Sequence, residues 1–155
     1  MPWSIFRRAD TAAVAALLAL TGAGAWGFLS TENVFGWDAV TFFYPWYSSL
    51  GDALSNGDVP GWNPHQFSGT PFAADLQSGW AYLPAMLLFT LLPLVAAAAG
   101  FVLSHLLIAG LSAYAFARAL GMEVSGAFLA AIAYEFGGLL YLQTGCCLLY
   151  VGVLA

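Results

Sequence analysis

Residues 94–117, LVAAAAGFVLSHLLIAGLSAYAFA, contain no charged side chain and are almost entirely apolar. They belong to a longer stretch without Asp, Glu, Lys or Arg that lies between Asp75 and Arg118. A helix that crosses a bilayer needs about 20 mainly apolar residues. Residues 94–117 therefore predict a transmembrane helix, and the rest of the chain is best interpreted around it.

The overall composition points to the same environment. The chain has 155 residues, of which 61% are hydrophobic, 16% aromatic and 7% charged, and its mean hydropathy is +0.82. Soluble domains carry about a quarter charged residues, so we expect an all-α polytopic membrane protein. The net charge is −5, with three arginines and no lysine. Nucleic acid is therefore not an expected partner, because no basic surface is available for its phosphates.

The start of the chain predicts its orientation. An arginine pair lies within residues 1–10, and the uncharged stretch of residues 11–29 follows it. The positive-inside tendency then leaves residues 1–10 in the cytoplasm and makes residues 11–29 the first transmembrane helix. A cleaved signal peptide is the alternative, because Ala23 and Ala25 resemble a cleavage site. The further hydrophobic segments favour the membrane span.

Residues 30–79 have a different character. They contain acidic residues but no lysine or arginine, and they are interrupted by turn-forming stretches such as SNGDVPGWNP. We expect a long extracytoplasmic loop with an amphipathic helix over residues 39–55, ending at Asn56-Gly57. Its many aromatic residues argue against disorder.

The position of Arg118 decides how many crossings follow this loop. Two crossings before Arg118 would leave it outside, whereas a single crossing returns it to the cytoplasm. We therefore expect residues 80–93 to form a short interfacial helix, bounded by Pro84 and Pro93. Residues 94–117 then form the second transmembrane helix.

The C-terminal part predicts a third crossing. Residues 118–123 form a cytoplasmic turn in which Gly121 is the expected helix C-cap, and residues 124–145 form the third transmembrane helix. Residues 146–155 begin a further membrane segment, and the chain looks truncated there. Cys146 and Cys147 are expected to be buried thiols, because neighbouring cysteines rarely form a relaxed disulfide.

Two acids in the outer loop are candidate catalytic groups. Asp38 precedes the predicted helix of residues 39–55 and is expected to cap it by accepting bonds from its first amides. A carboxylate held in this way near the membrane surface could also accept a proton. Asp75, the second candidate acid, is expected either to begin the interfacial helix or to face Asp38 across a cleft.

Several other residues of the loop suit a sugar ligand. Asn63, His65 and Gln77 are candidate substrate-binding residues, because their neutral polar groups can bond to hydroxyl or phosphate groups. They are equally suited to fixing the loop backbone. Trp46 offers an aromatic face for a sugar ring or a polyprenyl tail, and interfacial anchoring explains it as well.

Two ionisable residues fall within the predicted spans. Such residues are costly in a membrane and usually face a polar interior. Glu135 is thus a candidate functional residue, or one placed at the membrane interface. We expect His105 to be a neutral hydrogen-bonding residue between helices. No metal-binding motif is present, so we assign no metal ligands and no definite cofactor; a divalent metal stays an open requirement.

Four segments resemble, in their order, the amino-terminal part of the YfhO-type bacterial membrane proteins, which belong to the GT-C superfamily of membrane glycosyltransferases. They are WDAVTFFYPWYSSL, GDVPGWNPHQFSGTPFAADLQSGWAYLP, LSHLLIAGLSAYAFARALG and AAIAYEFGG. The similarity spans residues 35–138. The combination of P-x-WNP with QSG-x-x-YxP is its most specific part.

The resemblance implies a truncated GT-C-like fold in the bacterial cytoplasmic membrane. The implied activity transfers a sugar from a polyprenyl-phosphate donor to a cell-envelope acceptor outside the membrane. Asp38 occupies the place of the acidic residue that GT-C enzymes carry in their first outer loop, which implies a general-base role. The family has more spans than this chain, so the fragment alone is not expected to build a complete donor site.

Two other classes of function stay open. A transporter or flippase for a lipid-linked substrate would depend on Glu135 and His105 more than on Asp38. A non-catalytic assembly protein would use the aromatic loop for protein contacts, and would tolerate changes at Asp38 and Asp75.

Overall fold

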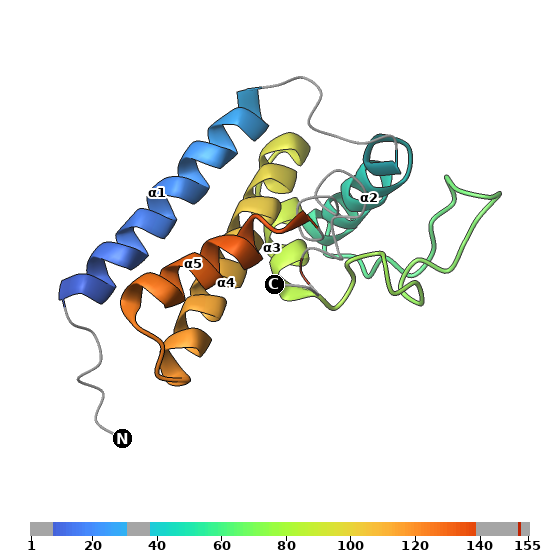
Figure 1. Cartoon of the computed structure of the whole chain (residues 1–155). Helices are drawn as coiled ribbons and strands as arrows, with labels where there is room; N and C mark the ends of the chain where they lie inside the picture. Colours follow the sequence, from blue (N-terminus) through green and yellow to red (C-terminus); the bar gives the residue numbers. More distant parts are fainter. Residues whose placement is uncertain (1–7, 31–37, 139–151, 153–155) are drawn as a thin grey trace.

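The computed structural model describes residues 8–30, residues 38–138 and Gly152, and its regular structure there is helical. One isolated bridge pairs Asn63 with Thr70, and the described ranges contain no β-strand. The all-α class is therefore confirmed. In chain order the helices are α1 (Arg8–Ser30), the π-helical η1 (Ala39–Phe43), α2 (Tyr44–Ser55), α3 (Leu83–Leu91), α4 (Leu94–Ala119) and α5 (Val124–Glu135) (Figure 1).

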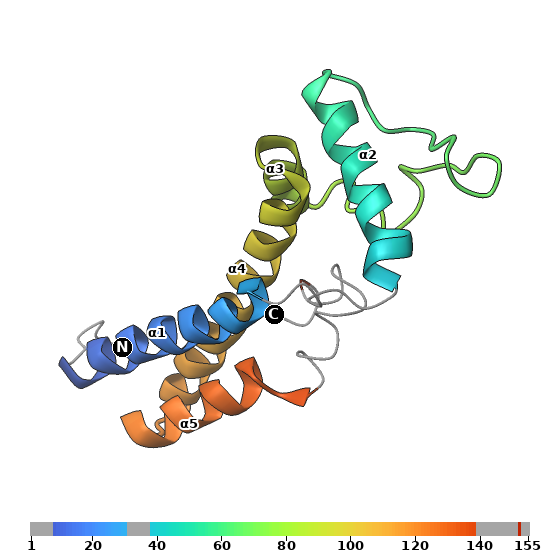
Figure 2. The same ribbon diagram turned by 90° about the horizontal axis from the view of Figure 1, so that it is seen from above.

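Helix α4 is the element that the other α-helices share. Helices α1 and α5 pack beside the C-terminal half of α4 and run in the opposite direction, as Figures 1 and 2 show. Helices α2 and α3 lie at its N-terminal half. The buried apolar residues form two groups, one on each half of α4.

The first group, which we call the aromatic core, joins η1, α2, α3 and α4. Tyr47 stacks on Phe89 with ring centroids 4.6 Å apart, and Phe89 lies 6.2 Å from Phe101 of α4. These contacts anchor α2 to α3 and α3 to α4, because buried aromatic rings contribute large apolar areas. The aromatic core consists of Phe43, Trp46, Tyr47, Leu50, Phe72, Ala85, Phe89, Ala97, Ala98, Phe101, Val102, Leu106 and Ala109.

The second group, which we call the small-residue core, joins α1, α4 and α5. Four of its six buried members are alanines, which let helix backbones approach closely. Its members are Ala13, Leu17, Tyr114, Ala117, Ala127 and Ala131. Helices α1, α4 and α5 form a bundle that packs through close backbone approach. In the other half of the molecule, η1, α2 and α3 pack against α4 through large rings.

Local sequence signals explain where the helices end. Beyond α2, Gly57 has a left-handed φ of 77°, and the amides of Gly57 and Asp58 donate to Leu54 O (3.0 Å) and Ala53 O (2.9 Å). This is a Schellman motif, which glycine enables because it lacks a Cβ. Gly121 (φ 86°) ends α4 with the same pattern, so the predicted cap there is confirmed.

The boundary between α3 and α4 lies at Pro93. Leu92 has extended backbone angles, as the residue before a proline usually does, and α4 starts directly after the proline. Pro84 lies in the first turn of α3, where its missing amide hydrogen costs nothing. The predicted short helix between these prolines is therefore present.

Only α4, among the helices in the described ranges, is long and apolar enough to cross a membrane by length and composition. Helix α5 is apolar but has 12 residues, which is short for a bilayer core of about 30 Å. Helix α1 covers the predicted first span and begins earlier, at Arg8. Glu32, Trp37 and residues 139–151, with both cysteines, lie outside the described residues.

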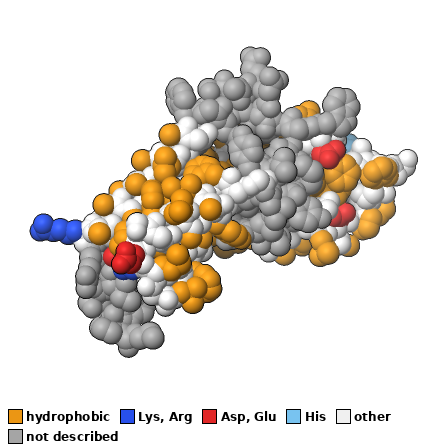
Figure 3. Space-filling view, in the orientation of Figure 1, with side chains coloured by type: hydrophobic (Ala, Val, Ile, Leu, Met, Phe, Trp, Pro, Cys, Tyr) orange, Lys and Arg blue, Asp and Glu red, His pale blue; other side chains and the backbone are white. Residues whose placement is uncertain are grey.

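The surface of the bundle is largely apolar. In the view of Figure 3, the described surface on the left, over the bundle, shows mainly hydrophobic side chains, with charged groups at its left end. Exposed large hydrophobic residues occur on all three helices of the bundle, for example Leu18 of α1, Phe116 of α4 and Leu129 of α5. An exposed apolar area of this kind marks a surface that contacts lipid or protein.

The approach of α2 to α3 generates a prediction at Gly51. A Cβ added there would lie 2.2 Å from the carbonyl oxygen of Phe89, so Gly51→Ala should force the two helices apart. We expect a loss of about 1–3 kcal/mol, typical of overpacking, measured as a lower unfolding temperature in detergent.

The control for this prediction is Gly22→Ala in α1, where an added Cβ meets no atom within 4 Å. Alanine should stabilise that helix by up to about 1 kcal/mol. Equal effects of the two substitutions would contradict the close helix contact at Gly51.

Candidate functional site

Asp38 lies at the exposed start of η1. Its backbone angles are helical (φ −67°, ψ −34°), and its side chain makes no capping hydrogen bond. A capping side chain normally reaches the helix amides from a residue with extended backbone angles. The predicted cap is therefore wrong, because Asp38 already continues the helix. The neighbouring Ala39 and Phe43 are buried, so the acid is carried by an anchored element.

Asp75 orders the loop locally. Its Oδ1 accepts a hydrogen bond from the Gln77 amide (2.7 Å), and its carbonyl accepts one from the Ser78 hydroxyl (2.8 Å). Helix α3 begins only at Leu83. The expectation that Asp75 begins the interfacial helix is therefore wrong, because its side chain closes a turn well before that helix.

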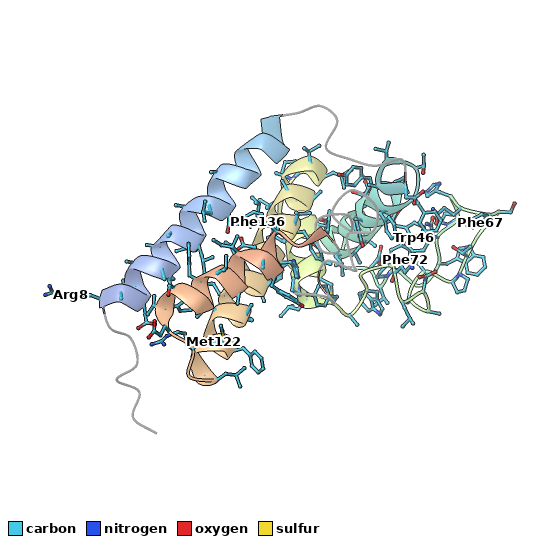
Figure 4. All side chains as sticks on the ribbon, viewed as in Figure 1. Arg8, Trp46, Phe67, Phe72, Met122 and Phe136 are labelled. Carbon is cyan, nitrogen blue, oxygen red and sulfur yellow. The ribbon has the colours of Figure 1, made fainter. Side chains whose placement is uncertain are left out.

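Asn63 and His65 lie in one turn of the same loop. The buried Asn63 side chain accepts a hydrogen bond from the His65 amide (2.9 Å), and the Asn63 backbone pairs with Thr70. Asn63 thus fixes the loop backbone, which is one of its two predicted roles. The His65 side chain is exposed, as is that of Phe67 at the outer tip of the loop (Figure 4).

Trp46 belongs to the aromatic core. Its side chain is 4% exposed, and its ring lies 4.4 Å from Phe42 and 6.1 Å from Phe72, centroid to centroid. Figure 4 shows Trp46 and Phe72 on the helix side of the loop. The prediction that the Trp46 face binds a sugar is corrected, because the neighbouring rings already cover it.

The structure brings four of the predicted site residues together as two pairs within the loop. Asp75 and Gln77 share one turn, and Asn63 and His65 share another. Asp38 directly precedes a separate element, η1. The candidate site that accessibility supports consists of Asp38, His65, Asp75 and the partly exposed Gln77.

A buried ionic network was missed by the sequence analysis. Asp10 Oδ1 accepts from Arg118 Nε and from Tyr114 Oη, each at 2.7 Å, and Arg118 Nη1 also donates to Met122 O. Asp10 is 1% exposed, although residues 1–10 are predicted to be a cytoplasmic tail. The available signal was the i, i+4 spacing of Tyr114 and Arg118, which puts both on one helix face.

His105 links α4 to the start of α3. Its Nδ1 lies 2.6 Å from Phe101 O, and its Nε2 lies 2.6 Å from Tyr82 Oη. Because a carbonyl only accepts, Nδ1 carries the hydrogen and Nε2 accepts from the phenol. Burial raises the pKa of Tyr82, which keeps that phenol protonated. His105 therefore makes a hydrogen bond between elements, as predicted, although its partner is the residue that precedes α3.

Glu135 is buried where α1, α4 and α5 meet. It is 1% exposed and hydrogen-bonded to the Thr21 hydroxyl of α1 through Oε1. An added Cβ on Gly110 of α4 would lie 2.2 Å from Glu135 Oε2. Three helices enclose the side chain, and the placement of Glu135 at the membrane interface stays a prediction.

An open groove of about 680 Å³ runs beside this bundle, between α1 and α5. Small residues of α1 form one side, and Arg118 and Glu123 contribute the charged groups. Its lining residues are Ala9, Ala13, Ala16, Arg118, Glu123, Val124, Ser125 and Phe128. In the described ranges, no three His, Cys, Asp or Glu side chains gather as a metal site.

Comparison with known proteins finds no matching protein-family model, no matching curated protein and no matching solved structure. The resemblance to YfhO-type proteins therefore stays a prediction, and the arguments that follow rest on the residues themselves.

The buried network predicts that Arg118→Gln destabilises the bundle. The substitution removes the cation of the ion pair while the Tyr114 hydroxyl still donates to Asp10, and a lost hydrogen bond to a charged group costs about 1.5–3 kcal/mol. Thermal unfolding in detergent measures the loss. Adding Asp10→Asn should restore part of it, because the buried charge is then gone as well.

Arg8→Gln is the matched control, because Arg8 is exposed on the same helix as Asp10 and should tolerate the change. An Arg118→Gln variant as stable as the parent would show that the ion pair contributes nothing.

Proposed function

We propose that the chain is a polytopic membrane protein of the bacterial cytoplasmic membrane, with its N-terminus in the cytoplasm. The proposed spans are residues 11–29, 94–117 and 124–145. Support comes from the apolar length of α4 and from the exposed hydrophobic side chains of α1, α4 and α5. The uncharged residues 11–29 and the arginines before them support the orientation.

Within this arrangement, we propose glycosyl transfer at the outer face. The donor is a sugar linked to a polyprenyl phosphate, and the acceptor is a hydroxyl group of the cell envelope. The acceptor oxygen attacks the anomeric carbon while its proton passes to Asp38. The bond from that carbon to the phosphate oxygen breaks, and polyprenyl phosphate leaves with the electron pair. The anomeric configuration is inverted.

The observation that carries this proposal is the exposed carboxylate of Asp38 on an anchored helix. Phe43 and Trp46, which follow it on η1 and α2, are buried in the aromatic core. A base must be held in a fixed geometry while remaining accessible to its substrate. Asp38 combines both properties better than the buried acids Asp10 and Glu135.

The turn residues have supporting roles in the same proposal. His65 and Gln77 offer polar groups for sugar hydroxyls or for the donor phosphate. Asp75 closes its turn and helps to present Gln77. The donor already carries its leaving group, and a divalent metal stays an open requirement of the step.

A transporter or flippase of a lipid-linked substrate is the second candidate. The observation that favours it is the buried Glu135, because acids enclosed by membrane helices often line transport pathways. In that case Glu135 and His105, rather than Asp38, would be essential.

Replacing Asp38 by Asn in the full-length protein should abolish sugar transfer while membrane insertion stays intact. The amide keeps the shape of the carboxylate but cannot accept the acceptor's proton at neutral pH. The measurement is incorporation of radiolabelled hexose from a polyprenyl-phosphate donor into the envelope fraction. Asp58→Asn is the matched control, since Asp58 is an exposed acid of the same loop. Transfer retained by Asp38→Asn would remove Asp38 from the mechanism.

The proposed orientation predicts which positions an impermeant thiol reagent can reach in intact cells. In a background with Cys146 and Cys147 replaced by alanine, Ser55→Cys and Ser68→Cys should be labelled from outside, because both serines are exposed in the loop. A cysteine introduced at Ser4 should react only after the cells are lysed. The reverse pattern would overturn the orientation and the outer-face reaction together.

A further inference from the structure

The carboxyl group of Glu135 takes no part in the loop site or in the proposed reaction. It is 1% exposed, and its Oε2 atom is buried without a hydrogen-bond partner. Thr21 of α1 and Gly110 of α4 are its neighbours across the bundle. A buried polar group is expected to be paired, so its protonation state needs a physical explanation.

The Thr21 hydroxyl limits how the hydrogens can be arranged. Its oxygen lies within hydrogen-bonding distance of two oxygens, Leu17 O at 2.9 Å and Glu135 Oε1. A threonine hydroxyl has one hydrogen but two acceptor lone pairs, and the Leu17 carbonyl can only accept. If Thr21 donates to Leu17, the hydrogen between Thr21 and Glu135 must come from the carboxyl group. Both contacts are then satisfied at once.

The charges around the site favour the same arrangement. In the described part of the chain, no arginine or histidine pairs with Glu135. Arg118 of α4 binds Asp10 of α1, together with Tyr114. His105, also of α4, hydrogen-bonds to Tyr82 and to the Phe101 backbone.

The remaining ionisable groups of α5 and its N-cap are Tyr134, which is exposed and neighbours Glu135, and Glu123 at the start of the helix. Neither supplies a positive charge. Since an unpaired buried carboxylate is very costly, the neutral acid is the favoured form.

The carboxyl group of Glu135 is also closely packed against α4. Oε2 faces Gly110 at a distance that would leave no room for a Cβ, so the carboxyl group is enclosed and no metal ion fits between it and α4. The ligand that this space admits is a proton.

We propose that Glu135 is a buried proton-binding site, held as a carboxylic acid that donates to Thr21. Releasing the proton to water leaves a carboxylate between α1, α4 and α5, which must separate or admit water to hydrate it. The site thereby couples proton binding to closure of the bundle. This inference concerns the bundle alone and does not depend on glycosyl transfer.

Infrared difference spectroscopy of the full chain in lipid vesicles tests the protonation state directly. The difference between the spectra of the parent and Glu135→Gln should show the carbonyl stretching band of a protonated acid at neutral pH, where exposed carboxyl groups are ionised. The band should shift in heavy water. Absence of the band at neutral pH would overturn the proposal, because it would mean that Glu135 is ionised and accepts from Thr21.

Stability as a function of pH provides the second test. If Glu135 is protonated in the folded state and ionised in the unfolded state, the folded state binds more protons than the unfolded state. The free energy of unfolding then falls as pH rises. From about pH 5 to neutral, the unfolding equilibrium constant of the parent should rise up to tenfold per pH unit relative to Glu135→Gln, the limit for one proton. Parallel pH profiles of the two proteins would overturn the proposal even if both fold well.

Two glycine substitutions in α4 locate the effect at this site. Gly110→Ala should displace the carboxyl group and shift or abolish the acid band, because its Cβ would lie 2.2 Å from Oε2. Gly100→Ala should leave the band unchanged, since its Cβ meets only Leu88 Cδ2 at 3.7 Å. The same response to both substitutions would show that the band does not report the enclosed carboxyl group.

Discussion

The fold depends on the packing of both halves of one apolar helix, α4, against different partners. Large rings cover its N-terminal half, and closely approaching alanine-rich helices cover its C-terminal half. An apolar helix of this length can satisfy its own backbone hydrogen bonds in water or lipid. The rest of the chain must supply packing against α4 and partners for its few polar side chains.

Polar contacts join the helices at three levels of the structure. His105 bonds to Tyr82 near the aromatic core, Glu135 meets Thr21 in the middle of the bundle, and Arg118 meets Asp10 at the end of α4. Each level ties α4 or α5 to another element. Because a buried polar group without its partner is costly, these contacts fix the register of the helices more strictly than the alanines around them can.

In the outer loop, buried rings anchor a backbone that carries exposed polar groups. The sequence predicted the helix of residues 39–55 and the short helix between Pro84 and Pro93, because proline, glycine and apolar runs act locally. It did not predict that Asp38 makes no capping bond, that Asp75 closes a turn before the interfacial helix, or that Trp46 is buried. Whether an acid caps a helix depends on backbone angles, and whether a ring is accessible depends on what packs over it.

The sequence by itself determined the all-helical class, the helix boundaries at glycine and proline, and the apolar character of α4, because these follow from composition and from neighbours along the chain. Only the tertiary structure decided that Asp10 pairs with Arg118 and that Glu135 is enclosed opposite Thr21 and Gly110. The physical reason is separation in sequence. The hydrogen-bonded pairs Asp10–Arg118 and Thr21–Glu135 are more than a hundred residues apart, so their contact depends on how whole helices pack.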